Sequence, residues 1–458
     1  MDEWTIRPER FTAEEALLDG APVRYRAARE LLYAARPVCP AYQTINVFVP
    51  EPYYHGGSVN GYTASSAPVL LANMVNGYKA SKAWGPGLAP RGNRPNIALW
   101  ALAHGCVVAC PGVRGRQMEG EHKENAGCAP AAILDLKAAV RFLRHNAGRI
   151  PGDMEKIIAT GVSAGGGLAA LLGSGGDHPD YALALMSMGA AEERDDVFAV
   201  LSYCPVTNLG HIDEAFEWMF SSCSGYIRPE RFGMDMAALP TIPFSSEQRR
   251  HHEALAARFP AYVSSLKLHS ADGTLLALEE DGSGIFSDYL LEHLLRCVQS
   301  ALDRDADATK MPWVTEKDGR AIVDSLPAYT SWLRRVKPPV GYDALDASSD
   351  ENELFRGCHF SRYGGENDTA GAAMAEPEVL KQMDPMAYIG EPCAVMAKHW
   401  RFRYGVLDRG SSPAIALLLA LKAAEAGAET DFAFAWGVGH MGYYDLPELF
   451  SWIDDICK

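Results

Sequence analysis

One segment of the chain combines a candidate nucleophile with the local geometry that would expose it. Residues 156–172 read KIIATGVSAGGGLAALL, in which a short apolar stretch leads into Gly161-Val162-Ser163-Ala164-Gly165 and then into small residues. A serine at the tip of a strand-to-helix turn has a strained backbone, and glycines two positions to either side let strand and helix pass closely. Ser163 is therefore a candidate nucleophile for acyl transfer, and the N–H groups of the following helix would stabilise the oxyanion.

The pattern G-x-S-x-G is a weak signal by itself, because the chain contains 42 glycines. Its context strengthens it. An apolar run at 155–160 follows Pro151-Gly152-Asp153 and predicts a buried strand, and leucines at helical spacing follow the serine as far as Gly173. The alternative is a glycine-rich turn between two core elements, in which Ser163 is present only because it is small.

Two further side chains that could complete a proton relay follow later predicted strands. Asp408 lies in the loop after a predicted strand at 394–403, and His440 lies among glycines after a predicted strand at 430–436. Because active sites in parallel sheets gather at the carboxyl ends of the strands, we expect both residues near Ser163. His440 would act as general base, and Asp408 would orient its ring. A lone loop aspartate or histidine is more often a surface residue, but the three together in this order favour catalysis.

The rest of the chain up to residue 206 alternates predicted strands and helices. The capping box Thr12-Ala13-Glu14-Glu15 predicts an N-terminal helix. Further strands are predicted at 44–49, 68–74, 106–110 and 197–203, and helices at 96–104 and 130–146. This alternation predicts βαβ units, and hence an α/β protein with a mostly parallel central sheet and helices on both faces.

A large, mainly helical insertion is predicted between residues 207 and 383. Capped helices are expected at 211–220, 246–259, 287–303 and 327–336. We expect this insertion to form a lid over the carboxyl edge of the sheet, with core segments at 1–206 and 384–458. Its aromatic residues would line an apolar pocket or form the lid's own core; they are Trp218, Phe220, Tyr226 and Trp332.

Charge and composition exclude several classes of partner. The formal net charge of −16 argues against nucleic acid or an anionic membrane, since basic pairs such as Arg334-Arg335 are isolated. The N-terminus has no secretory signal, no run reaches membrane-spanning length, and the ten cysteines are scattered, which predicts reduced thiols and a cytoplasmic location. Metal-ligand spacing is absent, so no metal or cofactor is expected. His251-His252 lies on a charged predicted helix, where we expect solvation.

Beyond these patterns, the chain resembles a known family, the bacterial tannases, or tannin acyl hydrolases. The resemblance rests on residues 54–78 (YHGGSVNGYTASSAPVLLANMVNGY), 107–116 (VVACPGVRGR), 129–146, 151–173, 199–209 and 403–412 (RYGVLDRGSS), and on the closing glycine-histidine loop. It implies an α/β-hydrolase fold with a helical lid, acting on esters of aromatic acids. It also implies a catalytic trio at Ser163, Asp408 and His440, and an oxyanion hole formed by the N–H groups of Ala164 and Gly77.

The chain departs from the family at one position of the acid-binding site. Tannases resembling it carry a carboxylate two positions after the triad aspartate, where this chain has Gly410. Two other positions that contact galloyl hydroxyls match Lys337 and Glu351. The alternatives are a solvated cation for Lys337 and an exposed acid for Glu351. Loss of one polar partner predicts a shift toward less hydroxylated aromatic acids.

The predicted activity is therefore hydrolysis of a small aromatic ester through an acyl-enzyme. Three other functions share these residues: a general carboxylesterase, a serine peptidase or acyltransferase on the same fold, and a binding module with a relic site. The sequence does not specify the alcohol half of the ester or the oligomeric state.

Overall fold

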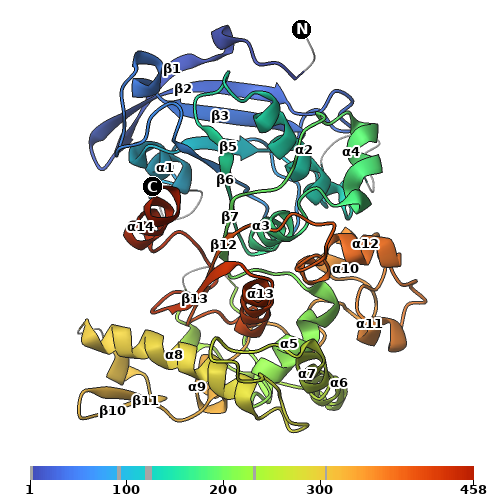
Figure 1. Cartoon of the computed structure of the whole chain (residues 1–458). Coiled ribbons are helices and arrows are strands. Elements are labelled where there is room, and N and C mark those ends of the chain that lie inside the picture. The colour runs from blue at the N-terminus through green and yellow to red at the C-terminus, as the bar shows by residue number, and fades with distance from the viewer. Residues whose placement is uncertain (1–3, 90–93, 119–125, 231–233, 305–306) are drawn as a thin grey trace. The chain divides into compact units, whose positions relative to one another are not determined.

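The computed structural model describes residues 4–89, 94–118, 126–230, 234–304 and 307–458, and the chain divides into two compact units (Figure 1). The first unit comprises residues 1–205, 377–401 and 442–458, and the second comprises 206–376 and 402–441. The division into core segments 1–206 and 384–458 and a lid at 207–383 stays a prediction.

The first unit is built on a mixed sheet. Its strand order is β1-β2-β3-β5-β4-β6-β7-β12. The strands are β1 (Thr12–Leu18), β2 (Ala21–Leu32), β3 (Thr44–Pro50), β4 (Pro68–Ala72), β5 (Val107–Pro111), β6 (Asp153–Val162), β7 (Ala199–Tyr203) and β12 (His399–Gly405). Of β12, only the residues up to Arg401 belong to this unit. β4 pairs in parallel with β5 and β6, and β6 with β7, whereas β1, β2, β3 and β5 pair antiparallel. All residues of β4, β5 and β7 are buried, as expected for strands covered on both faces.

Helices cover this sheet on both faces, which confirms the predicted α/β class. They are α1 (Ile97–His104), α2 (Ala131–His145), α3 (Ala164–Ser174), α4 (Ala182–Met188), α12 (Pro377–Gln382) and α14 (Leu446–Cys457). α1 and α14 are neighbours, since the His104 ring stacks on Phe450 at 4.5 Å, and they lie on the opposite face from α2 and α3 (Figure 1). The side chain of Asn96 caps α1 by accepting a hydrogen bond from Leu99 N–H.

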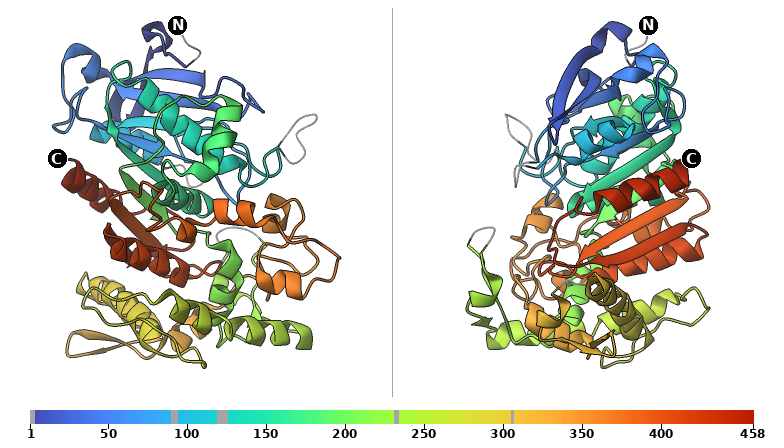
Figure 2. Two further views of the ribbon diagram at one scale, coloured as in Figure 1. Left: turned by 45° about the vertical axis from the view of Figure 1, so that its right-hand side comes forward. Right: turned by 90° about the vertical axis from the view of Figure 1, so that its left-hand side faces the viewer.

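The predicted N-terminal helix is wrong, because residues 12–18 form strand β1. The segment pairs with β2 in a hairpin at the edge of the sheet (Figure 2). Asp19 and Gly20 connect the two strands with positive φ angles of 49° and 84°, which is the backbone of a tight two-residue hairpin turn. The cross-strand ladder therefore outweighs the local helix signal of Thr12 and Glu15.

The second unit is mainly helical. Its helices are α5 (Ile212–Met219), α6 (Ser246–Ala256), α7 (Phe259–Leu266), α8 (Ile285–Asp303), α9 (Leu326–Leu333), α10 (Asp350–Leu354), α11 (Arg362–Glu366) and α13 (Pro413–Glu425). The second part of β12 is followed in the strand order by β13 (Glu429–Ala435). Two small hairpins complete the unit: β8 (Gly225–Tyr226) with β9 (Ile242–Pro243), and β10 (Val314–Lys317) with β11 (Arg320–Val323). The helices predicted at 211–220, 287–303 and 327–336 correspond to α5, α8 and α9, whereas the one predicted at 246–259 is divided between α6 and α7.

Short 3₁₀ helices occur in both units. They are η1 (Pro8–Arg10), η2 (Glu51–His55), η3 (Pro179–Tyr181) and η7 (Pro385–Ala387) in the first, and η4 (Leu209–His211), η5 (Met236–Ala238) and η6 (Ala308–Lys310) in the second.

The strand predicted at 394–403 begins later than expected, at His399. The residues before it bond outside the sheet. Val395 N–H donates to Gly176 O at 2.8 Å, and Ala397 N–H donates to Gly173 O at 2.7 Å, so this segment contacts the C-terminal end of α3 before it joins the sheet.

The expected solvation of the pair on α6 is wrong for His252, which is only 5% exposed. Its Nδ1 lies 2.6 Å from a carboxylate oxygen of Glu217, which also pairs with the fully buried Arg335. The Glu217 carboxylate satisfies the ring nitrogen of His252 and is itself paired with Arg335, which explains why a charged helix can bury this histidine.

All ten cysteines lie in the described part of the chain and are free thiols. Among the described helices, none is long and apolar enough to cross a membrane.

Candidate active site

The sequence GVSAG forms a sharp turn between β6 and α3, and Ser163 is at its tip. Ser163 has φ 60° and ψ −124°, a conformation that costs a non-glycine residue of the order of 1–3 kcal/mol. Two backbone bonds hold it there: its N–H donates to Tyr203 O at 2.9 Å, and its carbonyl accepts from Gly167 N–H at 3.0 Å. The strain is thus maintained by the adjoining strand and helix, which is the geometry of a nucleophile elbow.

The two flanking glycines are required by close packing. A Cβ atom at Gly161 would collide with the carbonyl group of Gly165. A Cβ atom at Gly165 would collide with the Asn73 side chain and would lie 2.9 Å from Val75 O. These clashes involve backbone atoms that cannot move independently, so both positions require glycine.

The two predicted oxyanion-hole residues lie in the first unit with Ser163. Ala164 is the first residue of α3, so its N–H has no partner within the helix. Gly77 lies in the loop after β4 with a positive φ of 55°, and its carbonyl accepts from Arg116 Nε at 2.6 Å.

Asn73, a residue not predicted from the sequence, connects this loop to the elbow. Its Nδ2 donates to Thr160 O at 2.9 Å and to Gly165 O at 3.0 Å. Gly165 N–H in turn donates to Val75 O at 3.1 Å. A buried asparagine just after an all-apolar strand was the available signal.

The other two predicted catalytic residues lie in the second unit and contact each other. His440 Nδ1 is 2.7 Å from Asp408 Oδ2. Asp408 is 1% exposed, whereas the His440 side chain is about one-third exposed. The carboxylate of Asp408 also accepts from Gly410 N–H at 2.9 Å, from Ser411 N–H at 3.2 Å and from Ser411 Oγ at 2.8 Å. This is the arrangement expected of an acid that orients a catalytic imidazole.

These contacts keep Asp408 ionised. Burial by itself would raise the pKa of the Asp408 carboxyl, but the charge and hydrogen bond of His440 oppose it. With the bonds from Gly410 and Ser411 they place the pKa of Asp408 below its usual range. Ser411 was missed from the sequence, although a hydroxyl three residues after the aspartate is a recognisable signal.

The predicted substrate-binding residues are linked by a residue that was not predicted, Tyr342. The Lys337 ammonium is 3.5 Å from the centroid of the Tyr342 ring. The Tyr342 hydroxyl donates to Gly410 O at 2.5 Å. Burial, and then the charges of Glu351 and Asp408, raise the pKa of Tyr342 well above its usual value. Glu351 is only 8% exposed, so the alternative of an exposed acid is wrong.

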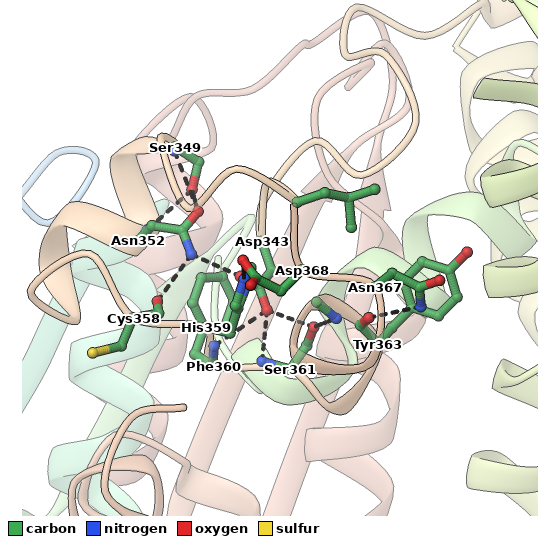
Figure 3. Close-up of polar contacts among 12 residues, drawn as sticks. Asp343, Ser349, Asn352, Cys358, His359, Phe360, Ser361, Tyr363, Asn367 and Asp368 are labelled. Atoms are coloured by element: carbon green, nitrogen blue, oxygen red, sulfur yellow. Dashed lines mark hydrogen bonds and ion pairs between the residues drawn. The ribbon is translucent and has the colours of Figure 1, made fainter. Parts of the chain in front are cut away.

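A buried polar network supports the helix that carries Glu351 (Figure 3). The Asp343 carboxylate lies 2.8 Å from His359 Nδ1 and accepts from Asn352 Nδ2 at 2.7 Å and from Ser361 Oγ at 2.6 Å. The other ring nitrogen of His359 is 3.0 Å from Asp368 Oδ1. Burial would lower the pKa of His359, but the bonds to Asp368 and Asp343 outweigh it and raise the pKa. Asn352, next to Glu351 on α10, is therefore held by the core of this network.

Comparisons with known proteins show which family the chain resembles. The BD-FAE protein-family model matches residues 120–225. The chain is 37% identical to the tannase of Fusobacterium nucleatum, with a TM-score of 0.93 and 99% of each chain covered. It is equally 37% identical to the native tannin acyl hydrolase from Lactobacillus plantarum, with a TM-score of 0.93 and 99% of each chain covered. A tannin acyl hydrolase in complex with ethyl gallate is 37% identical, with a TM-score of 0.92 and 99% of each chain covered. No curated protein matches the chain.

The fold and these comparisons define the protein as a carboxylic-ester hydrolase with the α/β-hydrolase fold. The identity extends over nearly the whole chain and not only over the elbow. The chain belongs to the tannase family.

Proposed function

We propose that this protein hydrolyses esters of phenolic aromatic acids, with Ser163 as nucleophile, His440 as general acid and base, and Asp408 as the partner of the imidazole. The observation that carries the proposal is the strained backbone of Ser163. A serine at φ 60° before a helix costs free energy, and an ordinary connection between a strand and a helix does not require this conformation. The 2.7 Å contact between Asp408 and His440 supports the assignment of the other two roles.

The reaction proceeds in two balanced halves. Ser163 Oγ attacks the acyl carbon while His440 takes its proton, and the N–H groups of Ala164 and Gly77 bind the oxyanion. The ester C–O bond then breaks, and His440 gives the proton to the leaving alcohol. Water repeats the sequence on the acyl-enzyme and releases the acid. Asp408, ionised throughout, fixes the imidazole tautomer and stabilises the imidazolium.

Lys337 and Glu351 would bind the hydroxyl groups of the acid ring, with Tyr342 between them. The relative in complex with ethyl gallate supports an aromatic acid as the acyl group. Gly410 has no side chain at the position where the tannases that the chain resembles carry a carboxylate. We therefore expect the protein to prefer acids with fewer hydroxyl groups than gallate has.

The remaining assignments are proposals of the same kind. The partner is a small aromatic ester and not a nucleic acid or a membrane. Ten free thiols support a reducing, cytoplasmic compartment. We propose that residues 207–383 form the lid and contribute the acid-binding residues Lys337 and Glu351.

The test is hydrolysis of a matched set of methyl esters by the purified protein: gallate, 3,4-dihydroxybenzoate, 4-hydroxybenzoate, ferulate and butyrate. We expect an aromatic ester to give the highest kcat/KM. Ser163→Ala should abolish turnover and also labelling by a fluorophosphonate. If butyrate is the best substrate, the protein is a general carboxylesterase; if Ser163→Ala retains activity, the mechanism is wrong.

Gly410→Asp extends the same experiment to the recognition of the acid. A Cβ atom at Gly410 would lie 3.7 Å from Val336 Cγ2 and 3.8 Å from Asp408 Oδ1, which are ordinary contacts. The substitution should therefore fold and raise the kcat/KM ratio of methyl gallate to methyl 4-hydroxybenzoate about tenfold. An unchanged ratio would separate position 410 from acid recognition.

A further inference from the structure

Arg409 is a half-buried cation without an acidic partner in the part of the chain that the structure describes. It directly follows Asp408, and no salt bridge joins it to a carboxylate among the described residues. The one hydrogen bond of its side chain among them is a long one, 3.5 Å from Nη1 to Arg334 O. Other arginines of the second unit are paired: Arg335 with Glu217 and Arg403 with Asp431. In a chain of net charge −16, an unpaired guanidinium is available for an anion from outside the protein.

The surroundings of Arg409 disfavour its charge. Burial, and next the neighbouring charge of Arg334, lower the pKa of the Arg409 guanidinium. The Arg334 guanidinium donates to backbone carbonyls, including Leu239 O at 2.8 Å, and these hydrogen bonds hold it in place. The backbone at Arg409 is also fixed, because Val336 N–H donates to its carbonyl at 3.1 Å. A bound anion would offset the repulsion between the two guanidinium groups.

An aromatic cluster adjoins this cation. The Arg409 guanidinium carbon is 5.8 Å from the centroid of the Trp332 ring. Trp313 connects the cluster, with its ring centroid 5.9 Å from Trp332 and 6.0 Å from Trp436. Trp332 and Trp436 are both partly exposed, whereas Trp313 is buried and its indole N–H has no acceptor among the described groups. Partly exposed indole faces beside a cation suit a ring that carries a negative charge.

This cluster is distinct from the residues proposed to bind the acid. The Lys337 ammonium lies over the Tyr342 ring, whereas the Arg409 guanidinium lies beside Trp332 and donates to the backbone of Arg334. The cluster is nevertheless close in sequence to the proposed catalytic residues, because Arg409 follows Asp408 and Trp436 precedes His440 by four residues. The part of an ester that the acid-binding residues leave unassigned is its alcohol half.

We infer that Arg409 and Trp332, with Trp436, bind the alcohol half of the ester and select alcohols that are cyclic hydroxy acids. The inference rests on the proposed ester hydrolysis. The carboxylate of the alcohol would pair with the Arg409 guanidinium, and its ring would pack on the indole of Trp332. When the ester C–O bond breaks, His440 protonates the alcohol oxygen, and the carboxylate leaves unchanged with the hydroxy acid.

The test compares two esters of 3,4-dihydroxybenzoate that differ in one charge. One has 3-hydroxycyclohexanecarboxylate as its alcohol, and the other has the neutral methyl ester of that hydroxy acid. We expect the kcat/KM of the anionic ester to exceed that of the neutral ester about tenfold at low ionic strength, and the ratio to fall in salt. Arg409→Gln should reduce the ratio to about one or less, and Arg409→Lys should keep part of it, because only the guanidinium pairs with two oxygens at once.

Two further variants guard against indirect effects. Arg304→Gln removes an equal charge from an exposed position of the same unit and should leave the ratio unchanged. Trp332→Leu should lower the kcat/KM of both ring esters relative to methyl 3,4-dihydroxybenzoate.

Each outcome decides between the two proposals. A wild-type ratio of one or less, or a ratio that Arg409→Gln leaves unchanged, overturns the alcohol site alone, since methyl 3,4-dihydroxybenzoate still reports the ester hydrolysis. If that methyl ester is not hydrolysed, the proposed function fails. Calorimetric binding of 3-hydroxycyclohexanecarboxylate to the wild type and to Arg409→Gln then decides the site: equal affinity, or no binding to either, overturns it.

Discussion

The elbow at Ser163 and the proposed acid-binding region around Tyr342 fix their side chains by different means. At the elbow the determinants are mainly backbone groups: Ser163 N–H, which donates to Tyr203 O, Gly167 N–H, and the bare Cα atoms of Gly161 and Gly165. Around Tyr342 they are side chains from several segments. Asp213 accepts from the N–H groups of Tyr342 at 3.0 Å and Asp343 at 2.8 Å, across about 130 residues of sequence.

The two regions are therefore sensitive to different kinds of substitution. The elbow depends on space, so adding a single methyl group should damage it. The acid-binding region depends on charge and hydrogen bonds in a buried setting, where an unpaired partner costs far more than a lost surface contact. Asp408, the proposed partner of the His440 imidazole, belongs to the second kind.

The largest effect is expected at Asp408. Asp408→Asn removes the charge that stabilises the imidazolium and should lower kcat about 10⁴-fold. Ser411→Ala removes one of the hydrogen bonds to the carboxylate and should lower kcat about tenfold or less. Both are measured by initial rates on methyl 3,4-dihydroxybenzoate. An Asp408→Asn variant within tenfold of the wild type would contradict the role given to this residue.

Gly165→Ala tests whether space alone controls the elbow. The new Cβ would collide with Asn73 and press on Val75 O, so we expect a loss of about 2–4 kcal/mol in the free energy of unfolding and at least a hundredfold lower kcat. Gly210→Ala is the matched control, because its Cβ would meet only Phe360 O at 3.8 Å. Chemical denaturation and initial rates check both. Equal effects of the two substitutions would show that the elbow can accommodate a Cβ atom at residue 165.

Asp343→Asn tests the buried network (Figure 3). It leaves His359 with one carboxylate fewer and should cost about 3–5 kcal/mol of stability, as breaking a buried ion pair does. Because Asn352 and α10 lose their anchor, KM should rise more for methyl 3,4-dihydroxybenzoate than for methyl benzoate. Asp346→Asn, an exposed neighbour, is the control for a charge change in the same loop. Equal changes in the two KM values would mean that the network supports folding without positioning Glu351.

The smallest effect concerns pH and Asp213. Burial is the first cause that raises the pKa of Asp213, to about 7, from an ordinary value near 3.8. A raised folded-state pKa means that stability is fully present below the unfolded pKa and is lost as pH rises through about 7. Asp213→Asn cannot ionise, so its stability relative to the wild type should increase by at least about 1 kcal/mol between pH 4 and pH 8. Denaturation midpoints at the two pH values measure this, and a constant difference would refute it.

Local sequence patterns predicted much of the first unit and failed where partners are distant. The helices α1, α2 and α3 and the strand β3 agree closely with their periodic or capped segments. Residues 12–18 carry a helix signal but form a strand, because pairing with β2 stabilises them more than an isolated turn of helix would. His252 was expected in solvent because its neighbours on α6 are charged, and only the approach of Glu217 and Arg335 explains its burial.

By itself, the sequence determined the nucleophile elbow, the α/β order of elements and the candidate residues Ser163, Asp408 and His440, because each is encoded by neighbours in the chain or by position after a strand. Folding is needed to show that Asp408 accepts hydrogen bonds from Ser411 and Gly410, that the Lys337 ammonium lies over the Tyr342 ring, and that no acid among the described residues forms a salt bridge with Arg409. The physical reason is burial. Whether a charge is paired or desolvated depends on segments that the chain brings together only on folding.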